Sequence, residues 1–298
     1  MLQSKHSDAF LAVAETGSFD LAAERLHITA SAVTLRVQAL EKNLGHLLII
    51  RERPCRVTQA GQQLLSYLQQ TKVLEQNLLE KLMGKSVDSQ FYTLNIATNA
   101  DSLATWLLST LQPVLIQEKI VIQLKVADQT QTHHLLEAGL VNACISTKRE
   151  SLKGCEVKAL GAMHYRMVAS PNFVTRYFKQ GINRESLKHA PAVIFNEHDQ
   201  MHHDVVYLHY GLSMAQYPHH LIPSSNAFLE SIMLGLGFGM VPEFQFNEYV
   251  KQGKLVEIMP EAETDIMLYW HHWKKQSDQL KKLTVQIIQS APFKINHS

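Results

Sequence analysis

The stretch SFDLAAERLHITASAVTLRVQALEKNLG, Ser18 to Gly45, has the pattern of two short amphipathic helices separated by a polar break. Ser18 and Thr29 are residue types that cap helix N-termini, and each stands just before one of these helices. The first helix is expected to turn Leu21, Ala22 and Leu26 inward. The second helix is expected to bury one apolar stripe, formed by Val33, Val37, Leu40 and Leu44.

The outer face of the second helix is mostly polar near its start. The side chains left on that face are Ser31, Thr34, Leu35, Arg36 and Gln38. Most of these residue types can hydrogen-bond to bases or phosphates, as the second helix of a helix-turn-helix does in the major groove. Helix spacing alone fits an ordinary helical hairpin in a protein core equally well.

A basic turn follows and favours the DNA-binding interpretation. The segment LLIIRERPCRVTQAG, residues 47–61, places Arg51, Arg53 and Arg56 around Pro54, with Glu52 as its single acid. Such a wing can contact flanking phosphates or the minor groove. The net charge of the whole chain is only +1, so any basic surface is a local one.

The rest of the chain has a different pattern. Its 298 residues are enough for two or three domains. Residues 1–83 read as helical, and the polar segment 84–90 is typical of a hinge. Strand and helix patterns then alternate, which predicts an α/β body with a mostly parallel sheet. Strands are expected at 91–97, 120–126, 141–146, 165–169, 192–195, 238–241 and 267–270, and helices include 102–117, 130–138 and 278–289.

Other classes of function have less support. No apolar run is long enough for a transmembrane helix, and the N-terminus lacks a signal-peptide core, so a cytoplasmic protein without disulfides is expected. His198 and His202 would share a helical face but lack further metal ligands. The loop Gly235–Met240 leads into a strand, so it does not form a phosphate cradle. Because no catalytic motif is present, neither an enzyme nor a cofactor is expected.

Residues 1–83 resemble the DNA-binding domain of LysR-type transcriptional regulators, through FLAVAETGSFDLAAERLHITASAVTLRVQALEKNLG followed by RVTQAG. The segments TLNIATNADSLATWLL, MVPEFQFNEYVKQGKLVEI and MLYWHHW resemble the ArgP/LysG subgroup, which controls the export of basic amino acids. Some members of that subgroup are also described as inhibitors of replication initiation. The resemblance implies an all-α winged helix-turn-helix with a long linker helix, followed by an α/β effector domain of two lobes, like periplasmic binding proteins.

The resemblance also assigns boundaries and DNA contacts. It implies a DNA-binding domain in residues 1–60, a linker helix in 58–83, a hinge in 84–90 and an effector domain in 91–298. Contacts with DNA are expected from Ser18, Thr29, Ala30, Ser31, Thr34, Leu35, Arg36, Gln38, Arg51, Arg53 and Arg56. Ala30 replaces a glutamine that is frequent in the family, and Thr34-Leu35 replaces its usual Ser-Arg pair. These departures do not affect the expected fold, but they leave the operator sequence unassigned.

The linker segment carries an apolar stripe that one isolated helix cannot bury. The stripe consists of Leu64, Leu68, Leu74, Leu78 and Leu82. A partner helix from a second subunit would cover it, and the resulting homodimer would place two recognition helices about 34 Å apart on a twofold site. The family resemblance further implies tetramers. The alternative is that the stripe packs on the chain's own body.

In the implied effector domain, lobe one spans about 91–161 and 265–289, and lobe two about 162–264. A ligand of such a fold lies at strand ends between the lobes. The expected effector-binding residues are Asn99, Ala100, Asp101, Ser102, Asp128, Glu197, Asp199, Ser224 and Ser225. Acids in this set suit the ammonium or guanidinium of lysine or arginine. The alternative is that Asp101, Asp199 and Ser225 only cap helices.

We therefore interpret the chain as a DNA-binding regulator of LysR type that responds to lysine or arginine. Its expected partners are double-stranded operator DNA, RNA polymerase and further copies of itself, without membrane or metal. Alternatives are a regulator with another effector, a nucleoid or origin-binding protein, and a solute-binding module. The absence of a signal-peptide pattern argues against the last of these.

Overall fold

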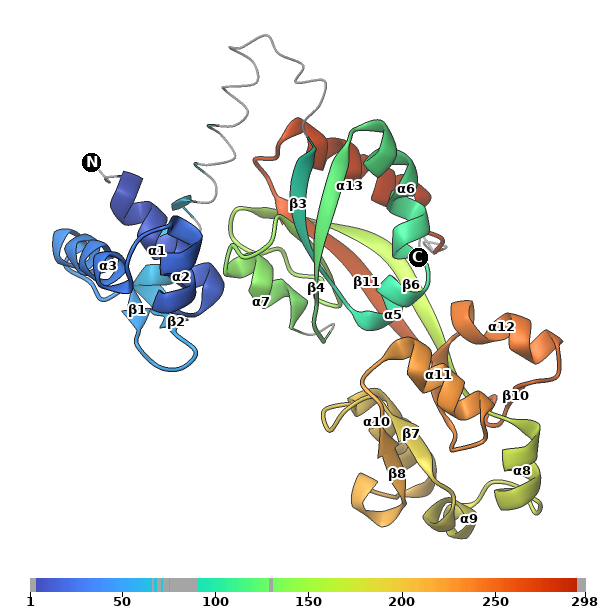
Figure 1. Cartoon of the computed structure of the whole chain (residues 1–298). Helices are drawn as coiled ribbons and strands as arrows, with labels where there is room; N and C mark the ends of the chain where they lie inside the picture. Colours follow the sequence, from blue (N-terminus) through green and yellow to red (C-terminus); the bar gives the residue numbers. More distant parts are fainter. Residues whose placement is uncertain are drawn as a thin grey trace.

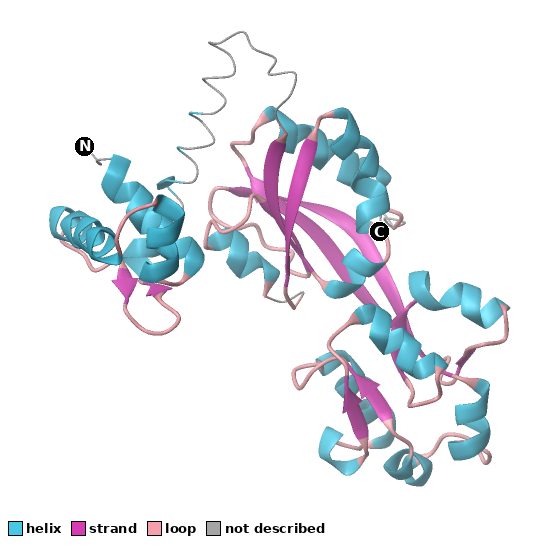
Figure 2. Ribbon diagram, in the orientation of Figure 1, coloured by secondary structure: helices cyan, strands magenta, loops and turns pink. Residues whose placement is uncertain are grey.

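A computed structural model describes residues 4–65, 67, 68, 71, 75, 91–128 and 131–293. Figure 1 shows a helical head at the N-terminal end and a larger body built from two lobes. Figure 2 shows that strands dominate one lobe of the body and continue toward the other. None of the helices in the described part of the chain combines the length and apolar character that crossing a bilayer requires.

The head packs three helices around its own core. Helices α1 (Ser4–Thr16), α2 (Phe19–Leu26) and α3 (Ala30–Leu44) precede an antiparallel pair of short strands, β1 (Ile49–Ile50) and β2 (Arg56–Val57). The core residues include Phe10, Val13, Ala22, Val33, Val37, Leu40, Leu48 and Leu65. The apolar stripe predicted for α3 is confirmed at Val33, Val37 and Leu40.

Two of the predicted inward positions of the head are wrong. Leu21 is 51% exposed, because α2 turns Ala22 and Ala23 toward the core instead. Leu44 is 39% exposed, because it is the last residue of α3 and Gly45 ends the helix in the left-handed conformation there. Leu26 is half-buried and packs on the core as expected.

Lobe one of the body carries strands β3 (Tyr92–Thr98), β4 (Ile120–Val126) and β5 (Ala143–Ser146). Its helices are α5 (Ala100–Ala104), α6 (Leu107–Gln117), α7 (Thr132–Glu137) and α13 (Asp278–Ser290). The helix predicted over 102–117 is therefore interrupted, at Thr105 and Trp106.

Lobe two carries helices α8 (Pro171–Tyr177), α9 (Arg184–His189), α10 (Gln200–Tyr210), α11 (Ser225–Met233) and α12 (Glu243–Lys251). Its strands are β7 (Ala192–Ile194), β8 (His219–Leu221), β9 (Gly239–Pro242) and β10 (Val256–Glu257). Gly235 lies in the turn between α11 and β9 with a φ of 76°, which confirms the helix-to-strand turn expected there.

Two long strands join the lobes. Strand β6 (Cys155–Ala169) pairs antiparallel with β11 (Thr264–Trp273), and the main sheet has the order β10-β6-β11-β5-β3-β4, with β9 also paired to β6. Only β3–β4 and β3–β5 are parallel in this sheet, whereas the four pairings that involve β6 or β11 are antiparallel. The prediction of a mostly parallel sheet is wrong, because the strands that join the lobes lie side by side in opposite directions.

Candidate functional site

The first part of the site is the turn between α2 and α3. The Ser18 hydroxyl accepts the backbone N–H groups of Asp20 and Leu21 at 3.2 and 3.4 Å, and the Thr29 hydroxyl accepts that of Ala32 at 3.2 Å. These bonds confirm both predicted N-caps. His27 ends α2 with a φ of 53°, and the chain then reverses into α3. The two helices and their short turn form a helix-turn-helix.

The outer face of α3 matches the sequence interpretation. Ser31, Leu35 and Gln38 are exposed, while Ala30, Thr34 and Arg36 are half-buried. Leu35 is 66% exposed, so its side chain is accessible on this face. The capping bonds occupy Ser18 and Thr29, and Ser31 lies 2.9 Å from the Thr29 hydroxyl. Direct DNA contacts from these residues stay predictions.

The wing between β1 and β2 is held against α3 by a buried carboxylate. Glu41, in α3, accepts the backbone N–H groups of Leu48 and Ile49 at 2.8 and 3.2 Å. This contact sets the distance between the recognition helix and the wing, because it joins both through a charged hydrogen bond. Nothing in the sequence interpretation identified Glu41, since its place beside Lys42 near the end of the helix is typical of an exposed acid.

The three wing arginines differ in their surroundings. The Arg51 guanidinium lies over the Phe19 ring of α2, 5.2 Å from its centroid, and this contact orients the Arg51 side chain. Arg56 forms an ion pair with Glu52, so part of its charge is offset. Arg53 is exposed. Arg51 and Arg53 therefore carry most of the positive charge that the wing presents.

The predicted dimerisation stripe lies only partly in the described structure. Leu64 and Leu68 are half-buried and pack against the core of the head. Leu74, Leu78 and Leu82 lie outside the described residues, as does the hinge 84–90. The dimerisation role of the stripe and the domain boundaries stay predictions.

The second part of the site is a polar cluster at the junction of the lobes. The Asp101 carboxylate in α5 accepts the Tyr165 hydroxyl at 2.7 Å and the Ser225 hydroxyl at 2.6 Å. The Gln245 side-chain amide donates to Ser225 at 2.9 Å. Lobe one, strand β6 and lobe two thus meet at a single carboxylate. We call these four residues the junction cluster.

Two of the helix-capping alternatives are wrong, and two residues of the junction cluster were not predicted. Asp101 does not cap α5, whose N-cap is Asn99, and Ser225 does not cap α11, whose N-cap is Ser224. Both side chains contact the other lobe instead. Tyr165 and Gln245 were not predicted, because their contacts join residues distant in sequence. Burial of Tyr165, followed by the charge of Asp101, raises its pKa well above the ordinary value, so it donates as a neutral phenol.

Buried polar groups continue from the junction cluster into lobe one. Thr98, Asn99 and Ser102 lie at the turn between β3 and α5, and all three are buried. The Ser102 hydroxyl has no hydrogen-bond partner among the described residues. A buried hydroxyl without a partner is costly, so this position suits a polar group of a ligand or an ordered water. Ala100 is half-buried beside it.

The remaining predicted effector residues are placed differently. Asp199 caps α10 by accepting the backbone N–H of His202 at 3.3 Å and also accepts that of Phe195 at 3.2 Å, which confirms its capping alternative. Burial raises the pKa of Asp199, and the nearby charges of Asp101 and Asp128 add to that rise. The negative charges of Asp101 and Asp128 therefore act on Asp199. Glu197, Ser224 and Asp128 are exposed.

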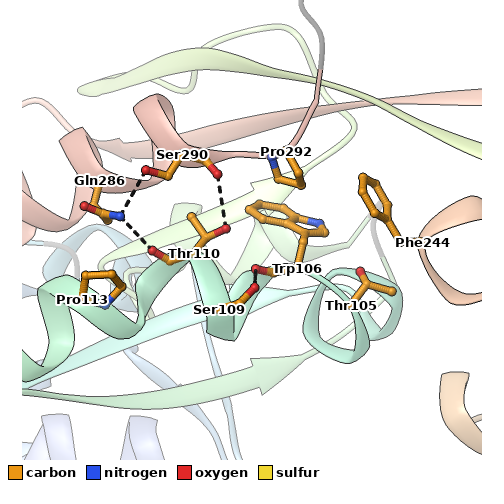
Figure 3. A pocket seen from close by; sticks show the side chains of 9 residues that line it. All are labelled: Thr105, Trp106, Ser109, Thr110, Pro113, Phe244, Gln286, Ser290 and Pro292. Carbon is orange, nitrogen blue, oxygen red and sulfur yellow. Dashed lines mark hydrogen bonds between the residues drawn. The ribbon is translucent and has the colours of Figure 1, made fainter.

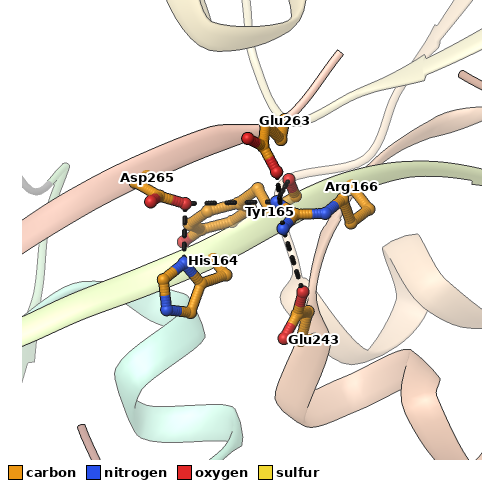
Figure 4. A network of polar contacts seen from close by, with 6 residues as sticks. All are labelled: His164, Tyr165, Arg166, Glu243, Glu263 and Asp265. Carbon is orange, nitrogen blue, oxygen red and sulfur yellow. Dashed lines mark hydrogen bonds and ion pairs between the residues drawn. The ribbon is translucent and has the colours of Figure 1, made fainter. Parts of the chain in front are cut away.

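A second charged network lies at the same junction (Figure 4). The Arg166 guanidinium in β6 lies 3.3 Å from Glu243 and 3.0 Å from Glu263, and its contact with Asp265 is 4.0 Å long. Asp265 also accepts His164 at 2.6 Å. Three carboxylates thus surround one guanidinium, and they tie α12 and β11 to β6. The junction of the lobes is acidic overall.

The cysteines and histidines offer no comparable site. Burial raises the pKa of Cys155 to about 11 and that of Cys144 further, so neither thiol is activated. His202 is fully buried whereas His198 is exposed, so the two do not converge. No group of three or more His, Cys, Asp or Glu side chains suited to a metal ion occurs in the described part of the chain.

Comparison with known proteins agrees with this architecture. Residues 5–62 match the family model "Bacterial regulatory helix-turn-helix protein, lysR family", and residues 91–291 match the "LysR substrate binding domain". The chain is 39% identical to the transcriptional regulator ArgP of Photobacterium profundum over 279 residues, which cover 94% of this chain and 93% of that one. It is 35% identical to ArgP of Vibrio vulnificus over 290 residues, 97% of each chain.

Solved structures show the same relationship. The crystal structure of ArgP from Mycobacterium tuberculosis is similar with a TM-score of 0.82 and 34% identity, covering 98% of both chains. LysG from Corynebacterium glutamicum, solved with bound effector Arg, is similar with a TM-score of 0.76 and 28% identity, over 97% of this chain and 98% of that one. The helix-turn-helix, the two lobes and these matches lead to one conclusion: the chain belongs to the LysR family of transcriptional regulators.

Proposed function

We propose that this LysR-type regulator binds a basic amino acid, arginine or lysine, at the junction of its lobes and thereby controls the gene of an amino-acid exporter or a related gene. The observation that carries the proposal is the Asp101 carboxylate, which accepts hydrogen bonds from both β6 and lobe two. The bound arginine in the LysG structure supports the same class of effector.

The charges at the junction fit a cationic ligand. Burial raises the pKa of Asp199, and the charges of Asp101 and Asp128 each add to that rise. A guanidinium or ammonium beside these acids relieves their repulsion and forms charge-assisted hydrogen bonds. The Ser102 hydroxyl, which has no hydrogen-bond partner within the described residues, supplies a neutral hydrogen-bonding group beside Asp101. Asn99, Ala100, Glu197, Ser224 and Ser225 complete the set of proposed contacts.

The junction cluster also supplies a mechanism of response. Asp101 accepts the Ser225 hydroxyl and so links lobe two to lobe one. A cation that binds Asp101 changes the strength of this contact. It therefore favours one arrangement of the lobes over another, which is the condition for an effector to shift the regulator between states.

In the head, we propose that Thr34, Leu35, Arg36 and Gln38 lie in the major groove, with Ala30 and Ser31 at the start of the helix. Arg51, Arg53 and Arg56 would contact the backbone, and the hydroxyls of Ser18 and Thr29 would stay near it as caps. The exposure of the α3 outer face supports this assignment. The leucine stripe at 64, 68, 74, 78 and 82 would join two copies of the chain. From the family resemblance we further propose that the dimers form tetramers, that the regulator contacts RNA polymerase, and that it acts on the nucleoid in the cytoplasm.

The test is an electrophoretic mobility shift on promoter DNA next to the protein's own gene and its neighbours, at physiological salt, with and without arginine or lysine. We expect a sequence-specific shift that either amino acid alters. Asp101→Asn should retain the shift and lose the response, whereas Asp204→Asn, which removes the same charge at an exposed position of α10 outside the proposed contacts, should behave like the unaltered protein. A specific shift that ignores both amino acids would remove the basic amino-acid effector. Binding spread evenly over unrelated DNA would contradict a promoter-specific role.

A further inference from the structure

A pocket of about 500 Å³ lies outside the junction cluster, against the helical side of lobe one. Its walls come from the α5–α6 break, from α6, from α13 and the residues after it, and from the start of α12 in lobe two (Figure 3). The lining residues are Thr105, Trp106, Ser109, Thr110, Pro113, Phe244, Gln286, Ser290 and Pro292. Because Phe244 belongs to lobe two, the pocket spans both lobes.

The lining carries no ionised side chain, and most of its polar groups are already engaged. The hydroxyls of Thr105 and Ser109 donate to backbone carbonyls of their own segment, at 2.6 and 2.9 Å. The Gln286 amide donates to the Thr110 carbonyl and to the Ser290 hydroxyl, both at 3.1 Å. What remains for a ligand is mainly apolar and aromatic surface, which does not solvate a charge.

Trp106 is the exception. Its side chain is only 3% exposed, and its indole N–H has no hydrogen-bond partner within the described structure. The indole nitrogen points toward the side of the pocket where Phe244 and Thr105 lie (Figure 3). The buried Trp270 differs, because its indole N–H donates to the Thr284 hydroxyl at 3.1 Å. A buried donor without a partner favours a ligand that supplies an acceptor.

Aromatic contacts hold this indole in place. Phe293 packs edge-on against Trp106 with 5.1 Å between ring centroids, and against Phe244 with 5.6 Å. Gly161 of β6 makes room for Phe293, since a Cβ at position 161 would lie 2.2 Å from the Phe293 Cβ. The walls of the pocket are therefore fixed by the C-terminal segment and by the strand that joins the lobes.

We propose that this pocket is a second small-molecule site, which takes an uncharged planar molecule with one hydrogen-bond acceptor for the Trp106 indole. Its ring would lie against Trp106 and Phe244. The site is linked to the junction cluster through α5, because Thr105 donates to the Asp101 carbonyl while the Asp101 side chain contacts lobe two. A ligand here would therefore favour one lobe arrangement, whatever the identity of the effector.

The test uses the full chain labelled with 5-fluorotryptophan and benzamide as the probe. The sequence holds three tryptophans, so the fluorine spectrum contains few signals, and Trp106→Phe identifies the one that belongs to the pocket. We expect benzamide to shift that signal saturably and to leave those of Trp270 and Trp273 in place. Shifts of all three signals, or no shift at all, would overturn the proposal.

Variants and competitors define the site. Phe244→Ala should weaken benzamide binding by about fivefold or more through the lost ring contact. Leu108→Ala is the matched control, because Leu108 is exposed on the same helix as Ser109 and does not line the pocket. Benzoate should bind at least about tenfold more weakly, since its charge finds no partner. If benzoate bound as tightly as benzamide, the site would not select a neutral ligand. If arginine competed with benzamide and reversed the shift of the Trp106 signal, the pocket would not be a separate site.

Discussion

Ser225→Ala tests whether the contact between Ser225 and Asp101 holds the lobes together. The substitution removes a hydroxyl that donates to a carboxylate at 2.6 Å and leaves the Gln245 amide without its acceptor. Hydrogen bonds to charged groups contribute about 1.5–3 kcal/mol, so we expect the free energy of unfolding to fall by about 2 kcal/mol. For a domain of this size, that loss lowers the melting temperature by roughly 4–8 °C.

The assay is thermal unfolding of the full chain, followed by circular dichroism or scanning calorimetry. Ser224→Ala is the matched control, because the neighbouring Ser224 is exposed and its side chain makes no capping bond. It should change stability by less than about 0.5 kcal/mol. If Ser225→Ala has the same melting temperature as Ser224→Ala, the contact between Ser225 and Asp101 contributes no stability and does not link the lobes.

A double-mutant cycle with Asp101→Asn isolates the pair itself. An asparagine has a single side-chain oxygen, so it can accept the hydroxyl of Tyr165 or that of Ser225 but not both, and it removes the charge that strengthens these bonds. We expect the two substitutions to be coupled by about 1 kcal/mol or more. If the two substitutions changed the free energy of unfolding in a strictly additive way, the Ser225 and Asp101 side chains would be close without stabilising each other.

Three further predictions concern the head and the buried histidine. Arg51→Ala should weaken binding to all DNA and reduce the slope of log affinity against log salt by about 0.9, measured by fluorescence anisotropy; an unchanged slope would remove Arg51 from the phosphate contacts. Leu35→Ser, at a 66% exposed position, should leave the melting temperature unchanged but alter operator preference in a selection from random DNA, and an unaltered preference would place Leu35 outside the interface. Burial, followed by the charges of His219 and His203, lowers the pKa of His202 from 6.5 to about 3. The unfolded state therefore binds a proton between these pH values that the native state does not, and stability falls as the pH drops below 6.5. His202→Phe should flatten this fall in urea unfolding, whereas His198→Phe, at an exposed position, should not.

Much of the head follows from its sequence, because local rules decide it. Ser18 and Thr29 are both caps, and helical spacing places Val33 and Val37 in the core. The same spacing fails at Leu44, where the helix ends, because a position in the last turn has no neighbouring element that must cover it. Periodicity identifies a face of a helix but does not determine how far the core extends along it.

The body was harder to predict, since long-range pairing decides it. Strand β6 was expected only over 165–169, whereas it spans Cys155–Ala169. The strand continues through Gly161, where the register against β11 shifts between Leu268 and Tyr269. Alternating helices and strands predicted parallel pairing, but that pattern carries no information about strands that return from the second lobe.

The junction cluster likewise combines residues that local sequence predicts with residues that only long-range contacts bring into place. Asp101, Ser102 and Ser225 were predicted, since each lies at the start of a helix after a strand or loop. Tyr165 and Gln245 were missed because nothing in their local sequence differs from ordinary core or surface positions. Their roles arise from contacts 64 residues away in the first case and 20 in the second. The break between α5 and α6 at Thr105 and Trp106, two residues that line the pocket, was also missed, because neither residue is of a type that predicts a turn.

The pairing of β6 with β11 has a consequence for protein engineering. Tyr165 lies opposite Thr264 and His164 opposite Asp265, so the chain leaves for lobe two and returns from it on adjacent strands. Adjacent strands lie only about 5 Å apart, a gap that a short hairpin loop closes. Lobe two is thus an insertion in lobe one, and the chain crosses between the lobes at two adjacent positions. A chimaera carrying the corresponding lobe of an ArgP relative would be joined at these two positions and would have to keep the contacts of Asp101 and Phe293 with lobe two.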